Sequence, residues 1–374
     1  MDNHRGEERL QVDHRRGRHA SEPDATGVRE DAVDLPGSGP RTAASGADGV
    51  QVGASRRRSV AKRLAGAVAV IVLVPLIGMA IWLAPPVFDR DFPQAPDAAV
   101  ALEPTGYVEV GGAELPYVEQ GTGTPVLLIH GAGDGLRFFE ALADVLADDH
   151  RVISYSRRGY EGAGSPANTW DQHHADAARI LEDLDAEGAI VVGLSMGGPI
   201  AVELALQHPD IVAELVLLEP GMYLEDHGTL DLLRVVLAIQ IRGVFMSEER
   251  AIVPFYRWVF THDDGHSPWD SSISDEMRYR LVNSVSAVTA DIESLDQAGE
   301  VPRERLGQLT TPVTLLVGER TQPAFRAIAA ELESLVPNVR RVEIPDAGHD
   351  LPNENPVDTG EEIRRAAQAV VGER

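Results

Sequence analysis

The chain has 374 residues, of which 43% are hydrophobic, so it can bury a sizeable core in one large domain or two smaller ones. Its formal net charge of −26 argues against a nucleic-acid-binding protein, because neutralising phosphates requires a basic face. The absence of cysteine excludes disulfides, thiolate metal sites and a cysteine nucleophile.

The first 63 residues differ in composition from the rest of the chain. They mix charged residues with Gly, Ser and Pro and contain almost no aromatic or large apolar side chains. Such a segment buries too little apolar surface to offset the entropy that a chain loses on folding. We therefore predict that residues 1–63 form a disordered tail.

An uncharged apolar run follows, from Leu64 to Ala84. As a helix, about 21 residues at ~1.5 Å each reach ~32 Å, enough to cross a hydrocarbon core of ~30 Å. Five basic residues flank its N-terminal side, namely Arg56, Arg57, Arg58, Lys62 and Arg63. The positive-inside rule then predicts a single-pass anchor at residues 64–84, with the tail in the cytoplasm and the rest outside. The alternative, a cleaved signal peptide, fits less well because the charged region before the run is far too long.

Residues 85–104 are rich in Pro, Ala and Asp and are predicted to be a semi-extended spacer. Beyond them, short β-rich runs alternate with helical stretches. Strands are expected at Tyr107–Val110, Leu115–Glu119, Val126–Ile129, Arg151–Tyr155, Ala189–Val192, Leu215–Leu218, Val313–Val317 and Arg340–Ile344. Helices are expected at Leu136–Ala147, Trp170–Asp185, Met196–Gln207, Phe325–Leu335 and Val357–Val371. This alternation predicts an α/β domain over residues 105–374, with a mostly parallel sheet covered by helices on both faces.

The sequence Gly193-Leu194-Ser195-Met196-Gly197 lies between a predicted strand and a predicted helix. This G-x-S-x-G pattern is typical of a sharp turn that exposes a nucleophilic serine above a sheet. The backbone N–H of Met196 lies at the start of the following helix, where it can donate to an oxyanion. A glycine-rich turn that happens to contain a serine is the alternative interpretation.

Two further turns support this interpretation. The strand Val126–Ile129 ends in His130-Gly131-Ala132-Gly133, a turn that can aim the backbone N–H of Ala132 at the same oxyanion. We interpret His130 as a structural support for this turn. After the last predicted strand comes Asp346-Ala347-Gly348-His349, and a histidine there can reach over the sheet edge to take the serine proton.

Together these motifs, in this order, resemble the α/β-hydrolase fold family over about residues 105–371. Arg157-Arg158-Gly159-Tyr160 is also similar to the family's Arg-Gly turn. The resemblance implies that Ser195 is the nucleophile, that His349 is the general base, and that Ala132 and Met196 are the oxyanion donors. It also implies that the helical insert at about residues 222–300 caps the active site.

The family's usual position for the triad acid is occupied by a different residue. The acid normally stands three residues after a glycine at the end of the penultimate strand, and here Gly318 puts Thr321 in that position. A hydroxyl does not stabilise an imidazolium as a carboxylate does. Either the triad is incomplete, or its acid comes from elsewhere in the chain.

Glu219 is the favoured replacement for the missing acid. It follows the strand Leu215–Leu218 directly, and some members of the family carry their acid at the end of that earlier strand. Glu319 is the alternative acid, and Asp346 is a third choice that lies very near His349 in sequence. A glutamate that only caps a helix or hinges the cap beside Pro220 is the structural alternative for Glu219.

These observations predict a membrane-anchored serine hydrolase that needs no cofactor or metal. It would cleave an ester-like small molecule through an acyl-enzyme on Ser195, outside the cytoplasm. Apolar side chains in the insert, at residues 230–241 and 252–260, suggest a substrate with an apolar part. The alternatives are acyl transfer, C–C bond hydrolysis or lyase chemistry on the same fold, or a catalytically dead hydrolase fold used for binding.

Overall fold

A computed structural model describes residues 76, 78–80, 82–84, 92–93, 103–133, 135–224 and 226–372 of the chain. The predicted tail at residues 1–63 lies outside these residues, as do most of the predicted anchor at 64–84 and most of the spacer. Among the described residues, no helix is both long enough and apolar enough to cross a membrane. The anchor therefore stays a prediction.

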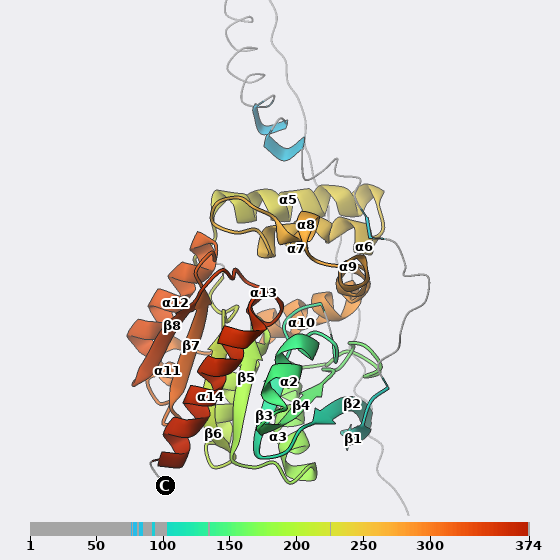
Figure 1. Cartoon of the computed structure of the whole chain (residues 1–374). Coiled ribbons are helices and arrows are strands. Elements are labelled where there is room, and N and C mark those ends of the chain that lie inside the picture. Colours follow the sequence, from blue (N-terminus) through green and yellow to red (C-terminus); the bar gives the residue numbers. More distant parts are fainter. Residues whose placement is uncertain are drawn as a thin grey trace, which may run out of the picture. The chain divides into compact units, whose positions relative to one another are not determined.

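The centre of the fold is an eight-stranded sheet in the order β1-β2-β4-β3-β5-β6-β7-β8 (Figure 1). Its strands are β1 (Gly106–Val110), β2 (Ala113–Gln120), β3 (Thr124–Ile129), β4 (His150–Tyr155), β5 (Ala189–Leu194), β6 (Val212–Leu218), β7 (Val313–Gly318) and β8 (Val339–Ile344). The pairings β1–β2 and β2–β4 are antiparallel, and all the others are parallel. The predicted mostly parallel α/β sheet is thus confirmed.

The helices cover both faces of this sheet, as the direction of the chain requires. The helices are α2 (Glu140–Leu146), α3 (Asp171–Asp183), α4 (Gly197–Gln207), α12 (Pro323–Leu335), α13 (Leu351–Glu354) and α14 (Pro356–Gly372). From β3 the chain steps to one side to reach β4, and from β4 through β6 it steps to the other side. Because parallel crossovers are right-handed, α2 lies on one face and α3 and α4 lie on the opposite face. The final helix α14 returns to pack against α2 (Figure 1).

This reversal of direction falls between β3 and β5, which are neighbours in the sheet. Ligands of open α/β sheets bind at the carboxyl ends of the strands beside such a switch point. Strand β5 is buried at all of its six positions and β3 at its last four, so the segments that follow them start from a rigid base.

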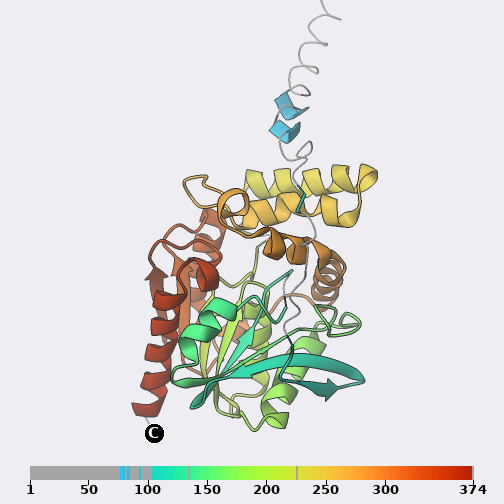
Figure 2. The ribbon, with the colours of Figure 1, turned by 45° about the vertical axis from the view of Figure 1, so that its right-hand side comes forward.

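The insert between β6 and β7 forms a helical cap over the carboxyl ends of the strands (Figures 1 and 2). Its helices are α5 (Leu230–Phe245), α6 (Glu248–Ala251), α7 (Val253–Val259), α8 (Pro268–Ser271), α9 (Asp275–Asn283) and α10 (Val285–Ala298), and α11 (Arg303–Leu306) leads into β7. Thr229 is the N-cap of α5, and its hydroxyl accepts a hydrogen bond from the N–H of Leu232. The stacked rings of Tyr256 and Trp269 help to form the interior of the cap.

One predicted helix begins later than its apolar pattern suggests. The sequence predicts Leu136–Ala147, but α2 begins at Glu140. The N–H of Leu136 is bound by the Ser156 hydroxyl at 3.2 Å, and its carbonyl accepts the Ser154 hydroxyl at 3.3 Å. These two hydrogen bonds to Ser154 and Ser156 hold Leu136 in a turn. Its backbone N–H and carbonyl therefore do not join the hydrogen bonds of α2.

Candidate active site

Ser195 occupies the sharp turn between β5 and α4. Its φ of +49° lies in the left-handed region, which costs a non-glycine residue on the order of 1–3 kcal/mol. Three backbone hydrogen bonds hold it there: its N–H donates to Leu218, and its carbonyl accepts from Gly198 and Gly221. A Cβ at Gly197 would stand 2.2 Å from the carbonyl oxygen of Ile129, so only glycine fits at that position. The half-buried serine is thus locked above the sheet.

The glycine-rich turn after β3 lies directly against this serine. A Cβ at Gly131 would stand 3.0 Å from the Ser195 Cβ and 3.6 Å from its Oγ. Among the described residues, the backbone N–H groups of Ala132 and Met196 donate no hydrogen bond within the protein. Both predicted oxyanion donors therefore belong to turns that meet at the predicted nucleophile, and the described part of the chain provides no acceptor for either N–H.

His349 and Glu219 are in direct contact. The Nδ1 of His349 lies 2.9 Å from Oε2 of Glu219, and both side chains are buried. With Nδ1–H donating to the carboxylate, the Nε2 of this imidazole carries a lone pair and can accept a proton. The ring of Phe325 stacks on His349 at a centroid distance of 4.0 Å and restrains its orientation.

The carboxylate of Glu219 is held by two further donors. The Gly318 N–H donates to Oε1 at 2.8 Å, and the Thr321 hydroxyl donates to Oε2 at 2.7 Å. Thr321, in the position where the family usually carries its acid, therefore serves as a hydrogen-bond donor to the glutamate. The φ of +40° at Glu219 marks a second strained turn at the end of a strand.

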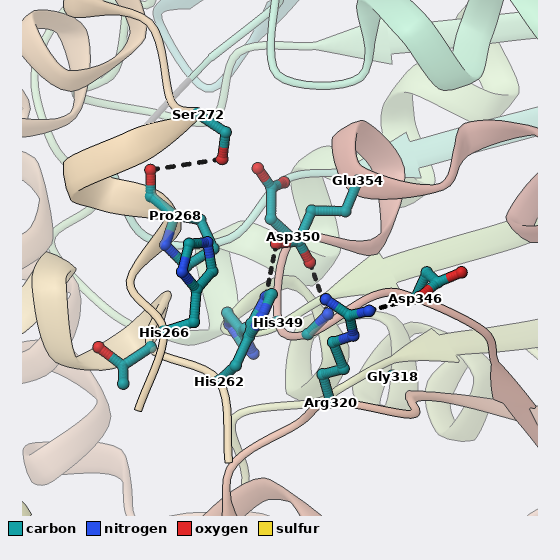
Figure 3. Close-up of polar contacts among 12 residues, drawn as sticks. His262, His266, Pro268, Ser272, Gly318, Arg320, Asp346, His349, Asp350 and Glu354 are labelled. Atoms are coloured by element: carbon teal, nitrogen blue, oxygen red, sulfur yellow. Dashed lines mark hydrogen bonds and ion pairs between the residues drawn. The ribbon is translucent and has the colours of Figure 1, made fainter. Parts of the chain in front are cut away.

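The other two candidate acids face away from His349. Glu319 is exposed, and its Oε2 accepts the N–H of Asp346 at 3.1 Å. Asp346 forms an ion pair with Arg320 at 2.6 Å (Figure 3). The structure therefore brings Glu219 to the histidine, and it gives Glu319 and Asp346 other partners.

His130 supports the oxyanion turn from beneath. Its Nδ1–H donates to the Gly131 carbonyl at 2.8 Å, and its Nε2 accepts the N–H of Arg157 at 3.0 Å. Burial, together with the positive charge of Arg157, holds the pKa of His130 well below its ordinary value. A neutral imidazole with one donor and one acceptor matches both of these contacts.

A buried ion pair connects this turn to the cap. The Arg157 guanidinium donates to the carbonyls of His130, at 3.1 Å, and Gly131, at 2.9 Å, and to Asp291 on α10 at 2.7 Å. Asp291 also accepts from Tyr160 at 2.7 Å and His173 at 2.9 Å. Burial alone would raise the pKa of Asp291, but the charge of Arg157 and the bond from His173 hold it below its ordinary value.

A second contact connects the cap to the histidine loop. Glu354 on α13 accepts the N–H of Gly348 at 2.5 Å through Oε2, and its Oε1 lies 2.8 Å from the Nε2 of His262 (Figure 3). His262 belongs to the cap segment between α7 and α8. The residue that precedes His349 is therefore held by a side chain that the cap also contacts.

Neither of these two connections between the cap and the loops of the site is predicted from the sequence. The signal that could have revealed Asp291 was helical spacing, because Ala287, Val288 and Ser294 share its buried side of α10. No comparable pattern marks the pair formed by His262 and Glu354. Among the described residues, no group of three or more His, Asp and Glu side chains is arranged to hold a metal ion.

Comparison with known proteins identifies the class to which this fold and site belong. A sequence profile of the Alpha/beta hydrolase family matches residues 126–362. The chain therefore belongs to this family, and the resemblance inferred from its motifs is confirmed.

Individual relatives are enzymes of several kinds. The chain is 29% identical over 252 residues to BpoC of Mycobacterium tuberculosis, which bears the name of a non-heme bromoperoxidase, with 63% of this chain and 90% of BpoC covered. It is 26% identical over 252 residues to a 2-(acetamidomethylene)succinate hydrolase of Mesorhizobium japonicum, with 65% and 87% covered. A thermophilic esterase from Thermogutta terrifontis shares its fold, with a TM-score of 0.58 at 23% identity and 71% and 97% covered.

Proposed function

We propose that this protein is a membrane-anchored serine hydrolase that cleaves an ester-like small molecule through an acyl-enzyme on Ser195. The observation that carries the proposal is the 2.9 Å contact between His349 and Glu219. A buried carboxylate in that position orients the imidazole and stabilises the imidazolium that forms when the serine loses its proton. With Glu219 as its acid, the triad needs no carboxylate in the position of Thr321.

The reaction balances with the residues of this chain and water. The Ser195 Oγ attacks the substrate carbonyl carbon as its proton passes to Nε2 of His349, and the N–H groups of Ala132 and Met196 stabilise the oxyanion. The ester C–O bond then breaks, and His349 gives the proton to the leaving alcohol. Water, deprotonated by the same imidazole, attacks the acyl-enzyme and releases the carboxylic acid and Ser195.

A fluorophosphonate probe tests the nucleophile directly. We expect stoichiometric labelling of the wild-type chain and none of Ser195→Ala, with peptide mapping that finds the adduct on Ser195. A wild type that resists labelling, or a Ser195→Ala variant labelled to the same extent, would rule out this chemistry. Ser165→Ala, outside the site, serves as the matched serine control.

The substrate is proposed to carry an apolar acyl or alcohol group. The cap contributes a set of aromatic side chains, including Phe255, Tyr256, Trp258 and Phe260, several of which are buried. A panel of p-nitrophenyl esters of increasing acyl length checks this, because a cap that encloses an apolar pocket should give a length optimum in kcat/KM. Rates that do not vary with acyl length would count against an apolar substrate pocket.

The anchor is proposed to be residues 64–84, with residues 1–63 in the cytoplasm, the spacer at 85–104 and the catalytic domain outside. The basic flank from Arg56 to Arg63 supports this orientation. A reporter fused after residue 100 should be active only outside the cytoplasm. Reporter activity inside the cell would reverse the proposed topology.

A further inference from the structure

Helix α5 carries a row of exposed apolar side chains on the outer side of the cap. Leu230 is 76% exposed and Val244 is 74% exposed, and Leu233 and Val236 are exposed between them on the same side of the helix. We call these four residues the outer cap face. Within α5, which the structure describes throughout, Gln240 is the one exposed polar residue on the side formed by Leu230, Leu233, Val236 and Val244.

The opposite side of α5 packs into the cap. Val235 and Ala238 are buried there, and α5 contacts α6 and α7. Figures 1 and 2 both show α5 as the outermost layer of the cap, on the side away from the sheet. The outer cap face is therefore not the wall of the catalytic pocket, and within the described residues it remains uncovered. Exposed apolar rows of this length usually mark a contact surface.

The chain that precedes the domain indicates which surface this row meets. Trp82, near the end of the predicted anchor, has its ring 5.8 Å from the Arg234 guanidinium on α5. Phe92 has its ring 4.3 Å from the guanidinium of Arg250, within α6. The chain thus contacts the α5–α6 part of the cap both where the apolar run ends and ten residues later.

This contact fixes the depth of α5 if residues 64–84 cross a bilayer. Tryptophan at the end of a membrane helix lies at the interface between hydrocarbon and water. A helix whose arginine touches that tryptophan must lie at the same interface, with its exposed side available to lipid. The outer cap face also carries no charge, whereas the chain as a whole has a net charge of −26 and is repelled by anionic headgroups elsewhere on its surface.

We infer that the outer cap face rests in the headgroup region of the bilayer that holds residues 64–84. This inference rests on the proposed anchor and extends it, because it turns the cap toward the lipid surface. Helices that lie in an interface place their apolar side about 5–10 Å into the boundary between headgroups and acyl chains. Substrates that partition into lipid would then reach the cap without crossing bulk water.

The absence of cysteine makes a sharp test possible. Single cysteines are introduced by Leu233→Cys and Val244→Cys, and each is labelled with an environment-sensitive fluorophore in the full chain reconstituted into phosphatidylcholine vesicles. Tyr107→Cys on β1 and Val357→Cys on α14 are matched controls, because both are exposed apolar positions away from the cap. We expect blue-shifted emission at 233 and 244, quenched by lipids that carry a nitroxide high on the acyl chain, and neither effect at 107 or 357.

Each other result overturns the inference. Emission at 233 and 244 that matches the controls would show that the face meets water. A blue shift without quenching would show that protein covers it, either a second copy or another segment of this chain. Quenching at all four positions would show that vesicle binding is not specific to α5. Thermal unfolding of each labelled variant confirms that the domain is folded.

Flotation on a density gradient separates this inference from the anchor on which it rests. Protein that does not float with vesicles would overturn the anchor and the inference together. Protein that floats but shows no quenching at 233 and 244 would overturn the inference alone. Fluorophosphonate labelling of Ser195 in the same samples reports on the proposed chemistry independently of both.

Discussion

The hydroxyl of Thr321 donates a 2.7 Å hydrogen bond to the carboxylate of Glu219. The residue in the family's usual acid position therefore donates to the candidate acid, which stands at the end of another strand. Because β6 and β7 are neighbours, their carboxyl ends bring these two side chains into contact, and the same carboxylate oxygen of Glu219 contacts His349. The candidate acid therefore follows β6 instead of β7, and its carboxylate still contacts Nδ1 of His349 at 2.9 Å.

Replacing this acid should abolish most of the activity. We expect Glu219→Gln to lower kcat by about 10⁴, because an amide holds the imidazole in the wrong tautomer and cannot stabilise the imidazolium. Steady-state hydrolysis of a p-nitrophenyl ester measures the effect. Glu319→Gln is the control, and the assignment fails if Glu319→Gln is the variant that loses activity.

Removing the supporting hydroxyl should have a smaller effect. A hydrogen bond to a charged group contributes about 1.5–3 kcal/mol, so Thr321→Val should lower kcat by roughly tenfold or more as Glu219 loses one of its donors. Thr321→Ser keeps the hydroxyl and should retain most of the activity. If the serine variant is as impaired as the valine variant, packing is responsible and the hydrogen bond is not.

Asp291 should matter to both stability and rate, although it lies in the cap. Asp291→Asn leaves the buried Arg157 charge without its partner, which typically costs about 3–5 kcal/mol in the free energy of unfolding. A displaced oxyanion turn should also lower kcat, by up to about 100-fold for a shift near 1 Å. Urea unfolding and ester hydrolysis measure the two effects. Asp296→Asn, on the exposed side of the same helix, should change neither.

The buried histidines should make stability depend on pH. Burial lowers the pKa of both His130 and His173 in the native state. Above about pH 6.5, the pKa of a histidine in the unfolded chain, these histidines are neutral in both the folded and the unfolded state, and they do not lower the free energy of unfolding. As the pH falls below that value, the histidines of the unfolded chain bind protons while those of the native state stay neutral. The free energy of unfolding therefore falls by up to about 1.4 kcal/mol per pH unit for each histidine.

Unfolding free energies measured between pH 7 and pH 5 check this slope. His130→Asn keeps a donor and an acceptor near the turn but cannot titrate, so its stability should fall less steeply with acid. His266→Asn removes an exposed histidine and should leave the slope unchanged. A His130→Asn slope identical to that of the wild type would contradict the predicted depression of the pKa.

The sequence could predict those parts of the site that are fixed by a strand and the turn after it. Ser195, Ala132, Glu219 and His349 each follow a strand of the parallel part of the sheet, and parallel strands bring their carboxyl ends to one edge. The order of strands and turns in the sequence therefore indicated that the Ala132 turn would meet Ser195 and that Glu219 would meet His349. The proposed catalytic roles of these residues await the experiments above.

The contacts that span the cap could not be predicted in the same way. Asp291 and Arg157 are 134 residues apart, and His262 and Glu354 are 92 residues apart. No local pattern records which cap side chain meets which loop, because that depends on how the helices of the insert pack. The late start of α2 has a similar origin, since distant hydroxyls compete for the backbone of Leu136.

The ion pair of Arg157 with Asp291 and the contact of His262 with Glu354 restrict which other inserts could replace this cap. An insert held only by apolar packing could be exchanged for another to change substrate preference. Here an exchanged insert would remove Asp291 from Arg157 and His262 from Glu354 at the same time. Grafting a foreign cap onto this sheet should therefore succeed only when the new insert brings an acid for Arg157 and a donor for Glu354.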